Sequence, residues 1–193
     1  VDVGTDLVVS KTISAKNVNE DIRNKAYTLN NKIDTHNDSW TQLGQDLVGD
    51  DDDYSGASVS LNADGTILAI GAYQHNGSST DKGRTRIYQY SSNNTWSQLG
   101  QDLLGGDGDQ SGVSVSLSAD GLTIAIGASK HDADGGNNHG RTRIWKYSGS
   151  TWSSIDNEGI VGDPGDESGY SVSLSADGTI VAIGAHNHDN QKG

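Results

Sequence analysis

Carboxylates gather at three places in the sequence, each just before a Gly-X-Ser segment. Carboxylate oxygens are the ligands that Ca²⁺ takes, about six to eight of them per ion. The spacing differs between the three groups, and no Glu stands at a fixed offset to chelate with both oxygens. Two interpretations therefore stay open, weak Ca²⁺ sites or a solvated acidic rim. The candidate metal ligands are Asp51, Asp53, Asp107, Asp109, Asp163 and Asp166.

A histidine also recurs, three residues after each Gly-Ala pair, and Asn or Asp follows it. Imidazoles bind metals and change charge near neutral pH. Equivalent atoms of stacked sheets lie on the order of 10 Å apart, which is too far for one ion with bonds of about 2 Å. We therefore expect these side chains to cap loops or to bind a polar ligand at a rim. The candidate ligand-binding residues are His75, Asn76, His131, Asp132, Asp134, His188 and Asp189.

These residues recur because the sequence itself repeats. Trp40, Trp96 and Trp152 are spaced by 56 residues, and the phrase Ser-Val-Ser-Leu-(Asn/Ser)-Ala-Asp-Gly follows each of them. Internal periodicity of this kind is the signature of a repeat architecture. The predicted organisation is a stem over 1–39, a first repeat over 40–95, a second over 96–151 and a partial third over 152–193.

Each repeat predicts four short strands and no helix. In the second repeat the first strand runs from Trp96 to Leu103, and Val113 to Leu117 alternates apolar and polar residues. An Ala-Asp-Gly turn follows. Thr123 to Ala128 is nearly all apolar, as in a strand covered on both faces, and Arg141 to Tyr147 alternates again.

Four strands in a unit of this size indicate an all-β fold of four-stranded β-propeller blades. The third repeat ends before its fourth strand, so the propeller is incomplete. We expect either a longer parent chain or closure by association of chains. A β-solenoid is the competing architecture, although its coils are usually shorter than these repeats.

The repeats resemble known blades. SVSLSADGLTIAIGAS with GRTRIWKYS resembles a WD40 blade, and DESGYSVSLSADGTIVAIGA resembles the integrin-α (FG-GAP) blade. Tyr73, Ser129 and His186 stand where that family has the Pro of Gly-Ala-Pro, and the family's calcium loop is missing. The similarity is greatest to integrin-like repeats of secreted or viral proteins of aquatic organisms, over residues 40–193. It implies an extracellular or virion-surface protein.

The stem has a different pattern. Residues 6–18 are rich in β-branched residues and predict one or two strands. The a/d spacing of a coiled coil then follows, at Ile22, Ala26, Leu29, Ile33 and His36. The segment is either an ordinary amphipathic helix packed on the first blade or an oligomer seam. It resembles the stalk-to-head junction of trimeric phage and algal-virus fibre proteins, which implies a homo-oligomer, such as a trimer, formed through the stem.

The composition limits the partners. The formal net charge is −13, so the surface repels phosphate and nucleic acid is not an expected partner. No apolar run is long enough to span a membrane, so membrane insertion is not expected. There is no Cys, which excludes disulfides and thiolate chemistry. Asn37, Asn76 and Asn93 lie in Asn-X-Ser/Thr sequons.

The sequence predicts binding rather than catalysis. Every Ser, His and Asp of interest recurs with the repeat, and no nucleophile elbow, phosphate loop or zinc-protease motif is present. We expect a non-enzymatic adhesive fibre protein that binds a receptor protein or a glycan. The loops 73–82, 129–139 and 186–193 differ between repeats and are the expected recognition surface. The alternative is a fragment of a secreted propeller enzyme, such as a glycosidase, whose active site lies outside this chain.

Overall fold

The computed structural model describes residues 41–75, 81–133 and 135–188. The chain divides into two compact units, Val1–Gln42 and Leu43–Gly193. Nearly all of the first unit lies outside the described residues, and so do the predicted strands and helix of the stem. Within the described ranges, the structure contains no helix with the length and apolar character of a membrane span.

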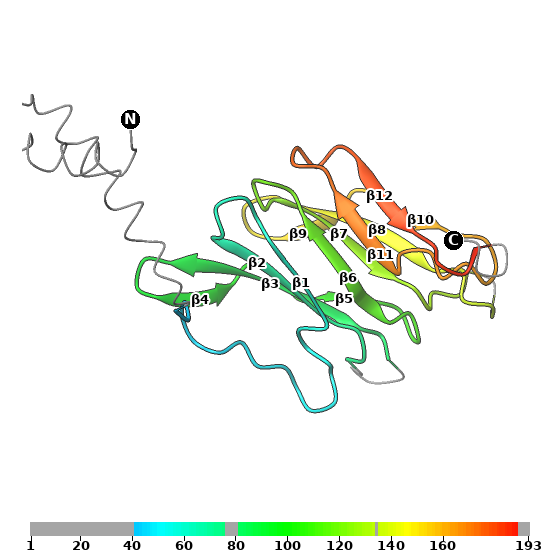
Figure 1. The fold of residues 1–193 in the computed structure, drawn as a ribbon, viewed down its shortest axis with the longest axis horizontal. Helices are drawn as coiled ribbons and strands as arrows, with labels where there is room; N and C mark the ends of the chain where they lie inside the picture. The colour runs from blue at the N-terminus through cyan, green and yellow to red at the C-terminus, as the bar shows by residue number, and fades with distance from the viewer. Residues whose placement is uncertain (1–40, 76–80, 134, 189–193) are drawn as a thin grey trace, which may run out of the picture. The chain divides into compact units, whose positions relative to one another are not determined.

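The described part of the second unit is built from β-strands, which confirms the predicted all-β class (Figure 1). The strands are β1 (Ser58–Leu61), β2 (Ile67–Ala72), β3 (Arg84–Ser91), β4 (Thr95–Gln98), β5 (Leu103–Leu104), β6 (Ser111–Leu117), β7 (Thr123–Ala128), β8 (Arg141–Tyr147), β9 (Trp152–Ser154), β10 (Ile160–Val161), β11 (Ser171–Leu174) and β12 (Val181–Gly184).

These strands form three antiparallel sheets. The first sheet has the order β1-β2-β3-β4, and β5 also pairs with β3. β4 and β5 pair with opposite ends of β3, so together they make one interrupted outer strand. The second sheet repeats this plan with β6, β7 and β8, followed by β9 and β10 on the outer edge of β8. The third sheet contains β11 and β12. Each full sheet is therefore a four-stranded meander.

The predicted strands agree with this plan except for the first strand of the second repeat, which is divided into β4 and β5 and pairs with β3 of the preceding sheet. β7 and β8 have the predicted bounds, and β6 begins two residues earlier than expected. The prediction of one continuous strand from Trp96 to Leu103 is wrong, because the strand breaks at Gly100. Gly100 has a φ of +80° and lies so close to the Trp152 ring that a Cβ there would overlap it.

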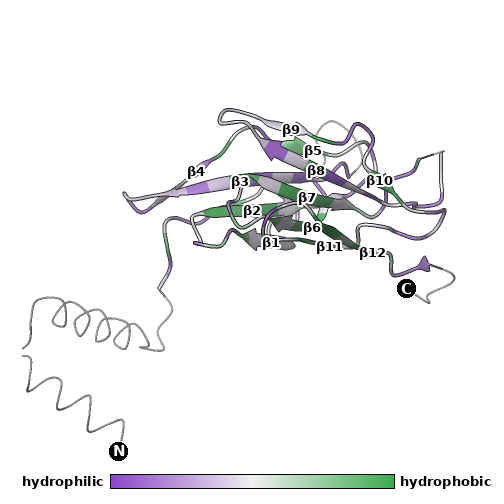
Figure 2. Ribbon diagram, turned by 90° about the horizontal axis from the view of Figure 1, so that it is seen from above, coloured by the Kyte–Doolittle hydropathy of each residue, from purple (hydrophilic) through white to green (hydrophobic). Residues whose placement is uncertain are grey.

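The sheets pack face to face in chain order. β1 and β2 pack on β6, and β6 and β7 pack on β11. The central strands β2 and β7 are buried along nearly their whole length, and Figure 2 shows the hydrophobic residues that they carry. Burial on both faces explains why these strands are nearly all apolar. The core cluster consists of Ile67, Ala69, Ile87, Leu103, Val115, Leu117, Ile124, Ile126 and Trp152.

A tryptophan contact joins each repeat to the next along the outer strands. The indole Nε1 of Trp152 donates to the backbone oxygen of Leu99 at 2.8 Å. The side chain of Gln101 accepts from the Trp152 backbone N–H at 3.0 Å and donates to the Trp152 carbonyl at 2.7 Å. Leu43 and Gln45 bind Trp96 in the same way. The recurring Leu-Gly-Gln phrase therefore holds the Trp of the following repeat.

Candidate binding site

One carboxylate of each acidic turn is buried. Asp53, Asp109 and Asp166 occupy equivalent positions, and their side chains are 4%, 6% and 11% exposed. Each accepts a hydrogen bond from the backbone N–H of the residue three positions earlier, at 3.2, 2.9 and 3.1 Å respectively. Each turn is therefore closed by its own carboxylate.

The recurring histidines are the partners of these carboxylates. His75, His131 and His188 each lie 22 residues after their Asp. The ring Nδ1 is 2.9, 2.9 and 3.0 Å from an Asp oxygen in the three repeats. Three of the candidate metal ligands and three of the candidate ligand-binding residues thus form Asp–His pairs, although the sequence suggests them separately.

An arginine from the start of the third strand completes the group in the first two repeats. Arg84 donates to Asp53 at 2.6 Å, and Arg141 donates to Asp109 at 2.7 Å. We refer to Asp53–His75–Arg84 and Asp109–His131–Arg141 as the two braces. The arginines are not among the sequence-based candidates, although the recurring Gly-Arg-Thr-Arg-Ile phrase marks them.

Burial and charge act in opposite directions in a brace. Burial raises the pKa of Asp53, but hydrogen bonds from His75 and from the Asp50 backbone, together with the charges of His75 and Arg84, leave the pKa below its usual value. Burial lowers the pKa of Arg141, and the charge of Asp109 opposes that effect. The opposite charges within a brace therefore offset part of the cost of burying each group.

The lowered pKa of Asp53 predicts acid lability. The stabilisation that Asp53 gives is complete above the pKa of an unfolded Asp, about 3.9. It is lost as the pH falls below that value toward the folded pKa. Asp53→Asn should therefore lower the urea midpoint clearly at about pH 6 and much less at about pH 2.5. The exposed Asp51 provides the control, since Asp51→Asn should leave the difference between the two pH values as in the wild type. A constant deficit for Asp53→Asn at both pH values would contradict the prediction.

Ligand atoms for a cation lie close together in two of the repeats. One atom from each of Asp50, Asp53 and His75 lies within 4.8 Å of the others, and the same holds for Asp163, Asp166 and His188. In the first group the guanidinium of Arg84 donates to both carboxylates, at 2.6 and 3.0 Å. The Arg84 guanidinium therefore already supplies the positive charge that a cation would bring to these two carboxylates. In the second repeat Gly106 stands where Asp50 and Asp163 stand, so this donor set does not recur.

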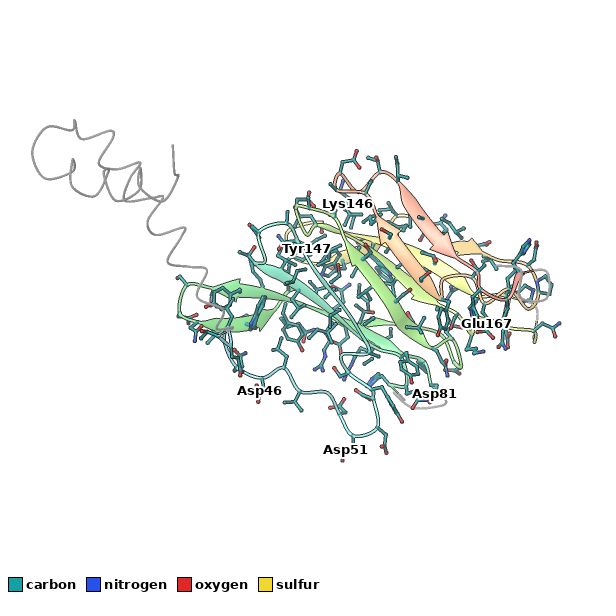
Figure 3. The ribbon with its side chains drawn as sticks, viewed as in Figure 1. Asp46, Asp51, Asp81, Lys146, Tyr147 and Glu167 are labelled. Atoms are coloured by element: carbon teal, nitrogen blue, oxygen red, sulfur yellow. The ribbon has the colours of Figure 1, made fainter. Side chains whose placement is uncertain are left out.

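The other candidate residues lie outside the braces. Asp51 is exposed, and Figure 3 shows it at the tip of the loop before β1. Asp107 forms an ion pair with Lys82 at 2.9 Å. Asp132 is exposed, and its carboxylate accepts from the backbone N–H of Asn138 at 2.6 Å, so it caps its loop. The candidates that lie outside the described residues are Asn76, Asp134 and Asp189.

A pocket lies beside the braces, where residues of all three sheets and their adjoining loops meet. Its volume is about 370 Å³. We call it the rim pocket, because the loops that precede β1, β6 and β11 and those that follow β2 and β7 border it. Its lining residues are Ala57, Tyr73, Gln110, Val113, Ser129, Lys130, Glu167 and Tyr170.

Two kinds of side chain dominate the rim pocket. Lys130 and Glu167 form an ion pair at 2.6 Å that joins the second sheet to the loop before the third. Tyr170 is about half exposed, and its ring centroid lies 4.2 Å from that of His186. Tyr73 similarly contacts Tyr54, with ring centroids 5.5 Å apart. Exposed aromatic faces next to charged and amide groups suit a ligand that has both apolar faces and hydroxyl groups.

Several lining residues of the rim pocket are sequence neighbours of the buried Asp and His residues. Gln110 follows Asp109 and Lys130 precedes His131 in the second brace, while Glu167 follows Asp166 of the third Asp–His pair. The backbone N–H of Lys130 also donates to the carbonyl of Asp109 at 3.3 Å. The buried ionic groups therefore fix the backbone on which the exposed lining residues stand.

Comparisons with family models and with curated proteins do not indicate a function for this chain. No known family model matches the chain, and no curated protein matches it. The function is therefore inferred from the residues that recur between the repeats, the residues that differ, and the place where the differing residues gather.

Proposed function

We propose that this chain is a non-enzymatic recognition module of an extracellular adhesive fibre, and that its rim pocket binds a glycan. In this proposal the three sheets are blades of a β-propeller, with four-stranded meanders stacked in chain order as support. An extracellular or virion-surface setting is what the similarity to integrin-like repeats implies.

One observation carries the proposal. The brace residues are identical in the repeats that contain them, whereas each described set of equivalent positions in the rim pocket differs between repeats. Ala57, Val113 and Tyr170 are equivalent to one another, and so are Tyr73 and Ser129. Stacking constrains the strands of a repeat protein, while the loops at its rim are free to carry recognition. Because these differing residues line one pocket above a constant support, they favour a binding surface.

The lining residues favour binding over hydrolysis. Glycosidases generally use two carboxyl groups that flank the scissile bond. Among the lining residues, Glu167 is the single carboxylate, and it is ion-paired with Lys130. Tyr73 and Tyr170 provide aromatic faces, while Gln110 and Ser129 provide hydrogen-bonding groups, which together suit the ring faces and hydroxyl groups of a sugar.

Glycan binding can be tested with a single substitution. The wild-type chain is screened on an array of neutral and acidic oligosaccharides, and the best ligand is titrated by calorimetry. Tyr170→Ala should weaken binding about tenfold or more, because it removes an exposed aromatic face from the pocket. Ile160→Ala is the matched control, since Ile160 is partly exposed on β10 and does not line the pocket.

The outcomes separate the alternatives. If Tyr170→Ala binds the ligand as tightly as the wild type, the rim pocket is not the binding site. If the wild type binds no oligosaccharide on the array, the glycan part of the proposal is wrong and a protein receptor becomes the better candidate.

A further inference from the structure

The sheet stack has two outer faces. We call the side of the first sheet that is turned away from the second sheet the leading face, and the corresponding side of the third sheet the trailing face. Val59 and Leu61 on the leading face are 61% and 57% exposed, and Ile180 on the trailing face is 69% exposed. Large apolar side chains are therefore uncovered at both ends of the stack.

The repeat shows what covers the equivalent side chains inside the stack. Val115 and Leu117 of β6 correspond to Val59 and Leu61, and they are 8% and 7% exposed against the first sheet. Ile67 corresponds to Ile180 and is 6% exposed against the second sheet. Each uncovered residue thus has a counterpart that is buried by a neighbouring sheet.

The polar contacts between sheets recur in the same register. Ser58 donates to the carbonyl of Gly112 at 2.7 Å, and Ser114 donates to that of Gly169 at 2.8 Å. The hydroxyl groups of Ser60 and Ser116 accept from Leu117 N–H at 3.0 Å and from Leu174 N–H at 2.9 Å respectively. On the trailing face, the equivalent residues Ser171 and Ser173 are exposed.

Glycines show the same complementarity of shape. A Cβ on Gly112 or Gly121 would meet atoms of the preceding sheet, whereas a Cβ on Gly56 or Gly65 would meet nothing within 4 Å. Gly56 and Gly65 are the leading-face equivalents of those two residues. The leading face therefore has the glycine surface that a preceding sheet requires.

We propose that another molecule of this chain docks head to tail, with its leading face on this molecule's trailing face. By the repeat register, Ser171 donates to the Gly56 carbonyl, Leu61 N–H donates to Ser173, and Ile180 packs over Gly65. The existing junctions use the first two strands of one sheet and the first strand of the next. β11, β12 and β1 supply these strands, so the chain contains all the main elements of a third junction.

The chemistry of the two faces favours a second molecule of this chain over an unrelated partner. The trailing face offers serine hydroxyl groups at the positions where β1 takes the carbonyl and N–H partners of its neighbour. None of the paired residues is charged. The contact joins two different faces, so it either closes into a ring or continues as a filament. Because each chain carries −13, association should strengthen as salt rises from about 0.05 to about 0.5 M.

Two blocked variants test the proposal by sedimentation of the full chain over a range of concentrations. Leu61→Asp blocks the leading face and Ser173→Asp blocks the trailing face. Each should raise the dissociation constant on the order of 100-fold, since each would bury an unpaired carboxylate. Mixed together they should form a one-to-one complex, because each variant retains the face that the other has lost. Leu104→Asp and Ser150→Asp, which place the same charge at exposed positions outside these faces, should associate like the wild type.

Three results would overturn the proposal. A wild-type chain that stays monomeric at every concentration would leave the two faces to further repeats of a longer chain. Association that both variants retain would place the contact elsewhere, for example in residues 1–39. Two variants that fail to complement each other would indicate a contact between like faces. Glycan binding at the rim pocket is measured separately and does not depend on any of these outcomes.

Discussion

Asp109→Ala should lower the free energy of unfolding by about 3–5 kcal/mol, because it leaves a buried guanidinium without its counter-charge. Asp109 accepts from Arg141, from His131 and from the backbone of its own turn. The Arg141 side chain is 14% exposed, so water replaces only part of what is lost. Urea unfolding followed by tryptophan fluorescence measures the change.

Asp107→Ala is the matched control two residues away. Asp107 is paired with Lys82, but its side chain is 66% exposed, so its removal should cost only about 0–1 kcal/mol. Equal effects of the two substitutions would contradict the view that Asp109 belongs to a structural brace.

A second measurement distinguishes a structural brace from a calcium site at Asp109. If Arg141 already supplies the positive charge, the difference in melting temperature between the wild type and Asp109→Ala should be the same with and without Ca²⁺.

The features that the sequence predicted well are local ones. β7 and β8 agree with their predicted bounds, because an Asp-Gly turn and a run of β-branched or alternating residues act within a few positions. The third hairpin turn shows this on a smaller scale. Asp177 accepts from Ser175, from the Thr179 N–H and from the Thr179 hydroxyl, and these hydrogen bonds lower its pKa. The recurring Ser-Ala-Asp-Gly phrase contains nearly everything that the turn needs.

The braces could not be predicted in this way, because their members meet only when the strands pair. Asp109 lies 22 residues from His131 and 32 from Arg141, and a residue's neighbours over that distance depend on sheet register. The same limit explains the break in the first predicted strand. Gly100 contacts the ring of Trp152, which lies 52 positions further along the chain. The feature of the sequence that could have indicated the braces is the spacing of 22 residues between Asp and His, which is the same in every repeat.

The rim pocket is marked in the sequence by differences between the repeats rather than by constant spacing. Its residues are those at which otherwise similar repeats disagree, such as Ala57, Val113 and Tyr170. Aligning the repeats shows the disagreement, but only the stacking of the sheets shows that the differing positions converge. The predicted recognition loops overlap this pocket at Tyr73, Ser129 and Lys130. The other lining residues lie just before β1, just before and within β6, and just before β11.

Gly127→Ala should destabilise the chain by about 3 kcal/mol or more, and is the substitution most apt to prevent folding. Gly127 is buried on β7, and a Cβ there would overlap the carbonyl oxygen of Gly169, a backbone atom in the turn that leads into β11 of the third sheet. A side chain could rotate away from an added methyl group, but a backbone carbonyl moves only with its strand. The second and third sheets would therefore have to separate, which would lengthen the hydrogen bond from Ser114 to Gly169.

Gly184→Ala is the control that isolates this contact. Gly184 occupies the same position on β12, where a Cβ would meet Ser171 of its own sheet and no atom of a following sheet. Gly127 meets Ser114 of its own sheet in the same way, so the two substitutions share every local cost and differ in the neighbouring backbone. In dilute solution, thermal unfolding should show a melting temperature close to wild type for Gly184→Ala and a much lower one for Gly127→Ala. Equal losses would mean that the glycine serves its own strand rather than the approach of the next sheet, and the stacking argument would then fail.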